Sequence, residues 1–243
     1  MPNNIQAIFL DVGNTLRIVV PDPEFANEAK RQLAALTGTD LSPEAFFALL
    51  EDRYKVLRKR AKEKLVEATE QEMWTQWMLP DFPAGKIAPL SGKLTRLWRD
   101  SDGRRVPRPD VKETIIELHR RGYLLGIIAN TITETEIPDW LESDELTGYF
   151  KTVILSSKLG IRKPDPEIYW EAARRIGVEP GACVYVGDNP TRDMEGTRLA
   201  GYGLFILFME PATLAKEPPT GAYHPDHTIQ KMRDLLDIFP PKS

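Results

Sequence analysis

The spacing of hydrophobic residues changes twice along the chain and divides it into three segments. Residues 5–10 form an apolar run interrupted only by Gln6, which predicts a short buried strand. Between residues 23 and 99 the apolar residues recur at helical spacing, as at Phe46, Leu49 and Leu50, and no strand-like run occurs. In the rest of the chain, short apolar runs alternate with amphipathic stretches. We therefore expect a strand, then an insert made only of helices, then an alternating α/β segment.

Turn and capping residues subdivide the helical insert. Pro43 is typical of the first turn of a helix, and Thr69 with Glu72 resembles a capping box. Prolines and a glycine between residues 80 and 85 interrupt the pattern, and a further short helix is expected over 92–98. These signals predict four or five helices packed together.

The alternating segment predicts a parallel sheet covered by helices on both faces, because each strand is followed by a helix. The expected strands cover 124–129, 152–155, 183–186 and 204–208, and the expected helices cover 111–121, 138–146, 166–176, 193–200 and 229–238. The charged, turn-rich stretch 101–109 is expected to be a linker that returns the chain from the insert. Residues 211–224 are rich in proline and are expected to form a surface loop.

Composition narrows the class of protein. A chain of 243 residues is long enough to bury a large core. A net charge of −4 argues against nucleic acid as a partner, because phosphate binding needs a clustered cationic face. The single cysteine, Cys183, excludes an intrachain disulfide and lies in an apolar run, so we expect a buried thiol. No apolar run approaches the length of about 20 residues that spans a bilayer, and a soluble, cytoplasmic protein is expected.

Polar residues suited to chemistry lie after the predicted strands or in the loops that follow them. Because the carboxyl ends of parallel strands meet at one edge of a sheet, these side chains are expected to converge there. The candidates are Asp11 with Thr15, Asn130 with Thr131, Lys163, and the pair Asp188 and Asp193. Three carboxylates at one edge favour a hard divalent cation, and Mg²⁺ is the natural occupant.

Lys163 lies in a stretch whose backbone is restricted by proline. Pro164 and Pro166 favour an extended chain before the next helix, so the direction of the lysine side chain is set. A cation directed at several carboxylates reduces their mutual repulsion and neutralises an oxygen of a bound phosphoryl group. A solvent-exposed lysine without a role is the alternative interpretation.

Together these motifs resemble those of the haloacid dehalogenase-like (HAD) hydrolase superfamily. The resemblance covers nearly the whole chain and rests on Asp11-Val12-Gly13-Asn14-Thr15, on residues 160–169, and on Gly187-Asp188 followed by Asp193 and Gly196. It implies an α/β protein with a Rossmann-like three-layer α/β/α core, in which the sheet is parallel. The resemblance implies that the core comprises residues 1–16 and 105–243, and that residues 17–104 form an inserted all-helical cap domain.

The resemblance also implies a role for each candidate. Asp11 is expected to be the nucleophile that forms an aspartyl-phosphate intermediate, and Lys163 to stabilise it. Mg²⁺ is expected to bind Asp11, Asp188 and the backbone carbonyl of Gly13, with Asp193 placing metal-bound water. The expected substrate-binding residues are Asn14, Thr15, Asn130 and Thr131. The implied activity is magnesium-dependent hydrolysis of a small, anionic phosphorylated metabolite.

Two positions depart from the pattern of phosphatases in this superfamily. Gly13 stands where these enzymes generally carry a second aspartate, which protonates the leaving group and later activates water. Such a group contributes about 10²- to 10⁴-fold to the rate. Its loss favours slow turnover or substrates with good leaving groups, such as acyl phosphates. Ala129 stands where the family places a serine or threonine that binds a phosphoryl oxygen.

Other members of the superfamily remain as alternatives. A haloacid dehalogenase also lacks the second aspartate, but it typically lacks the metal-binding acid, which Asp188 provides here. A phosphonatase needs a cap lysine that forms a Schiff base, and the candidates Lys55, Lys59, Lys62 and Lys64 belong to a charged run that is typical of a solvated helix face. A binding or regulatory protein that keeps the fold without turnover is the third alternative.

Overall fold

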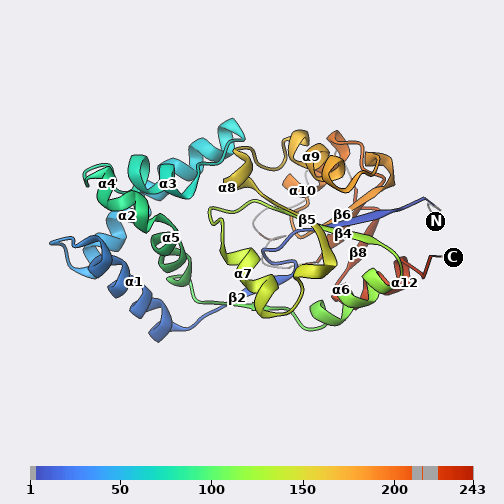
Figure 1. Cartoon of the computed structure of the whole chain (residues 1–243), viewed down its shortest axis with the longest axis horizontal. Helices are drawn as coiled ribbons and strands as arrows, with labels where there is room; N and C mark the ends of the chain where they lie inside the picture. The colour runs from blue at the N-terminus through green and yellow to red at the C-terminus, as the bar shows by residue number, and fades with distance from the viewer. Residues whose placement is uncertain (1–3, 210–214, 216–223, 243) are drawn as a thin grey trace.

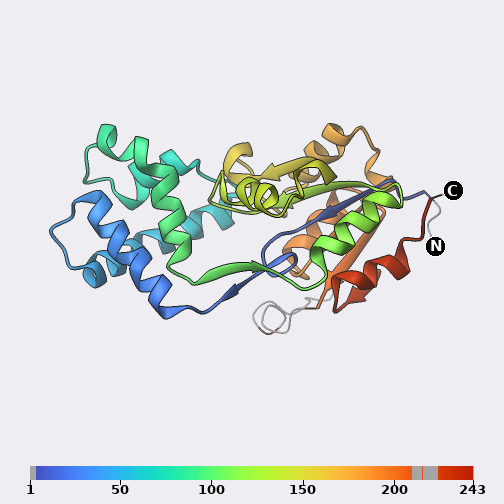
Figure 2. The same cartoon turned by 60° about the horizontal axis from the view of Figure 1, so that its bottom comes forward.

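The computed structural model describes residues 4–209, 215 and 224–242, which form two lobes joined by two chain segments (Figures 1 and 2). The described residues of the core lobe form a six-stranded parallel sheet in the order β5-β4-β1-β6-β7-β8. The strands are β1 (Ala7–Leu10), β4 (Leu124–Ala129), β5 (Phe150–Leu155), β6 (Cys183–Gly187), β7 (Leu204–Phe208) and β8 (His227–Ile229). Because β1 lies between β4 and β6, the residues that follow it lie in the middle of the sheet edge.

Helices cover both faces of this sheet, which confirms the predicted three-layer α/β fold. One face packs on α6 (Val111–Arg120), α7 (Glu136–Ser143) and α12 (Leu235–Ile238), and the other on α9 (Pro166–Ile176) and α10 (Arg192–Leu199). Successive strand residues point to opposite faces, so Ile8 and Leu10 join one hydrophobic cluster while Ala7 and Phe9 join the other. A strand buried on both faces must be apolar throughout, which explains the continuous run seen in the sequence.

The second lobe, called here the helical lobe, comprises residues 23–100 and contains no strand in that range. Its helices are α1 (Pro23–Thr37), α2 (Pro43–Lys64), α3 (Glu70–Glu72), α4 (Ala84–Ile87) and α5 (Ser91–Asp100), with a π-helical stretch over Met73–Met78 and a 3₁₀ turn over Ala88–Leu90. The predicted capping box is present, since Thr69 and Glu72 each cap the other's backbone N–H. The lobe has its own hydrophobic core, which includes Phe46 and Leu50 of α2.

A two-stranded antiparallel ribbon joins the lobes and was not predicted. It consists of β2 (Arg17–Val20) and β3 (Arg104–Pro107), with Val20 opposite Arg104 and Arg17 opposite Pro107. The first strand was expected within the helical insert, and the second within a turn-rich linker. Each strand has only four residues, which is too short to be recognised alone, and it is formed only by pairing with a segment far away in the sequence.

The carboxyl-terminal segment also differs from the prediction. The helix expected over 229–238 is wrong in its first part, where β8 pairs with β7 through Thr228 and Ile229. A 3₁₀ turn over Met232–Asp234 and then α12 follow.

The short helix α8 (Ser156–Leu159) was not predicted. The expected loop over 211–224 falls almost entirely outside the described residues. No helix in the described part of the chain combines the length and apolar character needed to span a membrane.

A buried carboxylate ties the ribbon to both lobes. Glu136, the first residue of α7, is 4% exposed and forms ion pairs with Arg17 of β2 (3.0 Å), Arg105 of β3 (3.7 Å) and Arg99 of α5. Burial of the Glu136 carboxyl opposes ionisation, but the three guanidinium groups outweigh it and lower its pKa. This cluster fixes the ribbon against the core and against the last helix of the helical lobe.

Candidate active site

Asp11 and Asp188 lie side by side because they follow neighbouring parallel strands. The backbone N–H of Asp11 donates to the carbonyl oxygen of Val186 at 2.9 Å, which continues the pairing of β1 with β6 by one residue. Asp188 follows β6 directly. Both carboxylates are buried, and they lie at the carboxyl edge of the sheet, where α/β proteins bind ligands.

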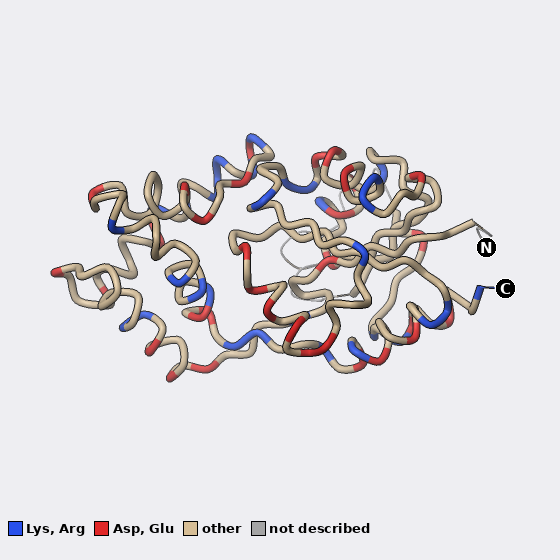
Figure 3. Tube along the Cα trace, viewed as in Figure 1, with Lys and Arg blue, Asp and Glu red and all other residues tan. Residues whose placement is uncertain are grey.

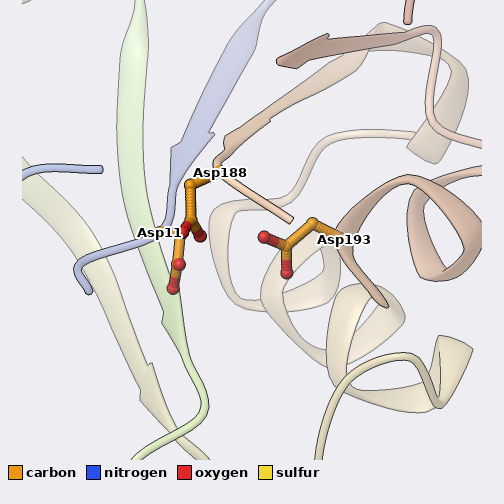
Figure 4. Close-up of side chains that lie close together, drawn as sticks. All are labelled: Asp11, Asp188 and Asp193. Carbon is orange, nitrogen blue, oxygen red and sulfur yellow. The ribbon is translucent and has the colours of Figure 1, made fainter. Parts of the chain in front are cut away.

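Asp193 completes a cluster of three carboxylates. It lies in the first turn of α10, and Figure 4 shows its side chain opposite Asp11 and Asp188. One oxygen from each residue lies within 4.8 Å of the others. Gly187 permits this approach, since a Cβ atom there would lie 2.5 Å from Asp193 Oδ2. Three buried carboxylates form a donor set that fits a hard cation such as Mg²⁺.

The Lys163 ammonium group connects the nucleophile candidate to this cluster. Its Nζ lies 3.0 Å from Asp11 Oδ1 and 2.9 Å from Asp193 Oδ1, and it also donates to the hydroxyl of Tyr185. Lys163 is 1% exposed, so the interpretation of a solvent-exposed lysine is wrong. With three acceptors, the ammonium group has a partner for each of its hydrogens.

Asn130 holds the backbone of Lys163 from both sides. Its Nδ2 donates to the Lys163 carbonyl oxygen at 3.0 Å, and its Oδ1 accepts from the Lys163 N–H at 2.8 Å. Both ends of the amide are therefore engaged within the protein. These contacts suit a residue that positions the lysine, in addition to lining the pocket described below.

Tyr185 is a site residue that the sequence analysis missed. It is the polar residue of the apolar strand β6, and its hydroxyl donates to the Ile128 carbonyl oxygen at 2.9 Å while accepting from Lys163. Burial, with the nearby carboxylates, raises the pKa of Tyr185 well above its usual value, so the hydroxyl stays protonated. The signal in the sequence was a single tyrosine among valines, and it does not specify a partner.

Replacement of Tyr185 by phenylalanine should lower the free energy of unfolding by about 1.5–3 kcal/mol, because a buried charged group loses a hydrogen bond. Urea denaturation measures this change. Tyr202→Phe is the matched control, since the Tyr202 hydroxyl is buried and donates only to the neutral Tyr169 carbonyl oxygen at 2.7 Å. The control should cost about 0.5–1.5 kcal/mol. Equal losses in the two variants would show that the contact with Lys163 adds nothing.

Arg192, also missed, lies among the three carboxylates. Its Nε lies 3.0 Å from Asp193 Oδ1 and its Nη2 3.3 Å from Asp193 Oδ2, and the same Nη2 lies 3.7 Å from both Asp11 Oδ2 and Asp188 Oδ1. Burial disfavours the ionised form of Asp193, but the charges of Arg192 and Lys163 outweigh it and lower the Asp193 pKa to about 2. The Asp193 carboxyl group is thus ionised throughout the physiological pH range.

A pocket of about 450 Å³ lies between the helical lobe and the core lobe. Lys55 and Arg58 of α2 line one side, and Arg162 and Arg192 of the core line the other. Asn130 and Thr131, two of the predicted substrate-binding residues, also line it. Basic and acidic residues are interspersed along the chain (Figure 3), so the gathering of basic side chains here is a local feature.

The pocket wall has an excess of positive charge. Its basic residues are Lys55, Arg58, Arg99, Arg162 and Arg192, and its acidic residues are Glu51, Glu67 and Asp102. Ion pairs engage residues of both signs. The acids Glu67 and Asp102 pair with Arg162 and Arg105, each at 3.1 Å. Among the basic residues, Lys55, Arg99 and Arg192 pair with acids outside the pocket lining: Asp52, Glu136 and Asp193. Five basic against three acidic side chains favour an anionic occupant. Lys55 and Arg58 are exposed, and Lys55 pairs with Asp52 at 2.8 Å, which agrees with the predicted solvated helix face although both residues also border the pocket.

Residues 65–67 of the helical lobe pair with residues 160–162 of the core. The Glu67 N–H donates to the Gly160 carbonyl oxygen at 2.9 Å, and the Arg162 N–H donates to the Leu65 carbonyl oxygen at 3.1 Å. The Glu67 carboxylate also accepts from the Ser156 hydroxyl at 3.1 Å. The helical lobe is thus bonded to the segment that immediately precedes Lys163.

The remaining candidates lie close to Asp11 or to the pocket. Gly13 and Asn14 are exposed on the turn after Asp11, where Asn14 has a φ of 58°. Thr15 is buried, and its Oγ1 has no hydrogen-bond partner among the described residues. The hydroxyl of Thr131 accepts from the Thr133 N–H at 3.2 Å. The substrate-binding roles of these residues stay predictions.

Comparison with known proteins gives one family model and relatives that match almost the whole chain. The model describes haloacid dehalogenase-like hydrolases and matches residues 5–201. A glyceraldehyde 3-phosphate phosphatase of Methanopyrus kandleri is 29% identical over 242 residues, which cover 96% of this chain and 97% of the relative. A phosphoserine phosphatase of Thermus thermophilus is 27% identical, with 96% and 98% covered.

The fold is similar to that of solved structures. The crystal structure of a 2-haloacid dehalogenase from Pseudomonas syringae superposes with a TM-score of 0.70 at 23% sequence identity. The match covers 96% of this chain and 97% of the dehalogenase. At this identity the comparison establishes the fold and leaves the reaction open.

Proposed function

The chain belongs to the haloacid dehalogenase-like hydrolase family, and we propose that it is a magnesium-dependent phosphatase that acts on a small phosphorylated metabolite. The observation that carries this proposal is the buried group of Asp11, Lys163, Asp188 and Asp193 at the carboxyl edge of the sheet. Relatives that match nearly the full chain are named phosphatases of glyceraldehyde 3-phosphate and phosphoserine, which supports the phosphatase class.

In the proposed reaction, Asp11 is the nucleophile. Its carboxylate oxygen attacks phosphorus, the bond from phosphorus to the leaving oxygen breaks, and an aspartyl phosphate forms. Water then attacks the phosphorus, releases inorganic phosphate and regenerates the Asp11 carboxylate. The Lys163 ammonium, 3.0 Å from Asp11 Oδ1, reduces the repulsion between the carboxylate and the anionic substrate.

Asp11, Asp188 and Asp193, with the Gly13 carbonyl, are the residues proposed to hold Mg²⁺. The ion would supply positive charge next to the phosphoryl oxygens. Three carboxylates alone would repel an anionic phosphate, so a divalent cation changes the balance of charge in favour of substrate binding. The protein's own contribution is to hold the three side chains buried and directed toward one another.

The helical lobe is proposed to act as a cap over this site, with residues 17–104 as cap and residues 1–16 and 105–243 as core. The pocket between the lobes lies under α2 and α5 and carries an excess of basic residues, which supports a small anionic substrate. Asn14, Thr15, Asn130 and Thr131 remain the proposed substrate contacts from the core. Gly13 in place of an acid supports a preference for leaving groups that need no proton.

The test is a panel of substrates assayed with and without Mg²⁺. We expect phosphate release in the presence of Mg²⁺, faster from an acyl phosphate than from an alkyl phosphate ester, and loss of activity after chelation with EDTA that added Mg²⁺ restores. A 2-haloacid belongs in the panel. Halide release without metal would favour the dehalogenase alternative, and no turnover of any compound would favour a binding protein.

A further inference from the structure

The Arg192 guanidinium group lies beside the three carboxylates, where a metal ion bound to them would also lie. The guanidinium group contacts all three acids, since it approaches both oxygens of Asp193 and lies 3.7 Å from one oxygen each of Asp11 and Asp188. No other arginine among the described residues is paired with these three carboxylates.

If the guanidinium group stays beside these oxygens, the binding of a magnesium ion to them becomes less favourable. Mg²⁺ binds carboxylate oxygens at about 2.0–2.1 Å and requires a nearly octahedral arrangement of ligands around it. The permanent positive charge of Arg192 lies 3.7 Å from one oxygen each of Asp11 and Asp188 and repels the ion there, and its hydrogen bonds to Asp193 use lone pairs that the ion needs. Because arginine does not deprotonate in proteins, the penalty is relieved only if the side chain moves.

The structure offers Arg192 a place to move. Its side chain is 30% exposed and lines the pocket between the lobes, beside Arg162 and Arg58. Arg192 is the first residue of α10, so its side chain can rotate into the pocket without disturbing the core of the sheet. Lys163 has no such freedom, since it is 1% exposed and is held by four partners: Asp11, Asp193, Tyr185 and Asn130.

We propose that Arg192 competes with Mg²⁺ for the Asp11, Asp188 and Asp193 carboxylates, so that metal binding requires displacement of its guanidinium group. The competition sets the affinity of the site for Mg²⁺ below that of the carboxylates alone. This inference rests on the proposed function only in assuming that the three acids bind Mg²⁺.

The experiment is calorimetric titration of MgCl₂ into the full-length wild-type protein and into Arg192→Gln. We expect the dissociation constant for Mg²⁺ to fall by about tenfold or more in Arg192→Gln, because one positive charge leaves the cluster. The matched control is Arg198→Gln, on the same helix, which removes the same net charge. Arg198 pairs with Asp226 at 2.8 Å, away from the cluster, and its variant should bind Mg²⁺ as the wild type does.

A second variant keeps the test valid if Arg192→Gln folds poorly. Arg192→Lys retains the charge but cannot make the same paired contacts, so its affinity for Mg²⁺ should lie between those of the wild type and Arg192→Gln. Equal or weaker Mg²⁺ binding by both Arg192 variants would overturn this inference and leave the proposed function intact. Failure of the wild type and every variant to bind Mg²⁺ would overturn both.

Discussion

Replacement of Asp11 by asparagine is expected to reduce kcat/KM for phosphate release by about 10⁴-fold or more, which is the order of loss seen when an enzyme nucleophile is removed. Asparagine has nearly the same shape but is a poor nucleophile, and it offers a neutral oxygen where the proposed metal site needs a charged one. Steady-state kinetics with the best substrate of the panel measures the loss.

The control for this prediction is Asp102→Asn. Asp102 lines the same pocket but is exposed and paired with Arg105 at 3.1 Å, so the variant should retain activity within a few-fold of the wild type. Circular dichroism and urea denaturation show whether both variants remain folded. If Asp11→Asn kept wild-type activity, Asp11 would not be the nucleophile, and equally negligible rates in the wild type would indicate a protein without turnover.

Replacement of Gly13 by aspartate is expected to raise turnover of alkyl phosphate esters by about 10²- to 10⁴-fold, because it restores an acid two positions after the nucleophile. The structure permits this change. A Cβ atom at Gly13 would meet nothing within 4 Å, and Gly13 does not require a positive φ. The gain should be small for acyl phosphates, whose leaving groups depart without a proton.

Gly13→Asn distinguishes an acid from a merely polar side chain at the same position. The amide cannot donate a proton to a leaving oxygen, so this variant should show no gain with alkyl phosphate esters. A folded Gly13→Asp variant that still binds Mg²⁺ but gains no activity would contradict the idea that a missing proton donor limits the rate. The substrate preference would then have to arise in the pocket wall.

Much of the fold could be predicted because its strands and helices carry local signals. The strands of the parallel sheet are buried on both faces and therefore appear as continuous apolar runs, as in β4 and β6. The helical lobe has helical periodicity and recognisable caps, such as Thr69 with Glu72. The proximity of Asp11 to Asp188 also followed from the sequence, since each ends a strand of one parallel sheet.

The features that could not be predicted depend on pairing between distant segments. The ribbon forms only because residues 17–20 meet residues 104–107, and β8 forms only on the edge of β7. The two strands of the ribbon and β8 each have too short an apolar run to indicate a strand. Local propensity is a weak guide where a partner strand provides the hydrogen bonds.

The same limit applies to the site. Asp11, Asp188 and Lys163 could be named from motifs, but Arg192 and Tyr185 act through contacts that spacing does not encode. Asn130 was predicted to bind substrate, and no sequence pattern indicates that both ends of its amide hold the Lys163 backbone. Contacts of this kind depend on side-chain direction in three dimensions.

The hydrogen bonds between residues 65–67 and residues 160–162 connect the position of the helical lobe over the pocket with the segment that precedes Lys163. If the helical lobe moves away from the core, the two segments separate and the two backbone hydrogen bonds between them must break. It would also pull Glu67 away from Arg162, the immediate neighbour of Lys163. Separation of the lobes therefore leaves the core contacts of Lys163 in place but frees the segment that immediately precedes it, so this segment is held from both lobes only when the pocket is enclosed.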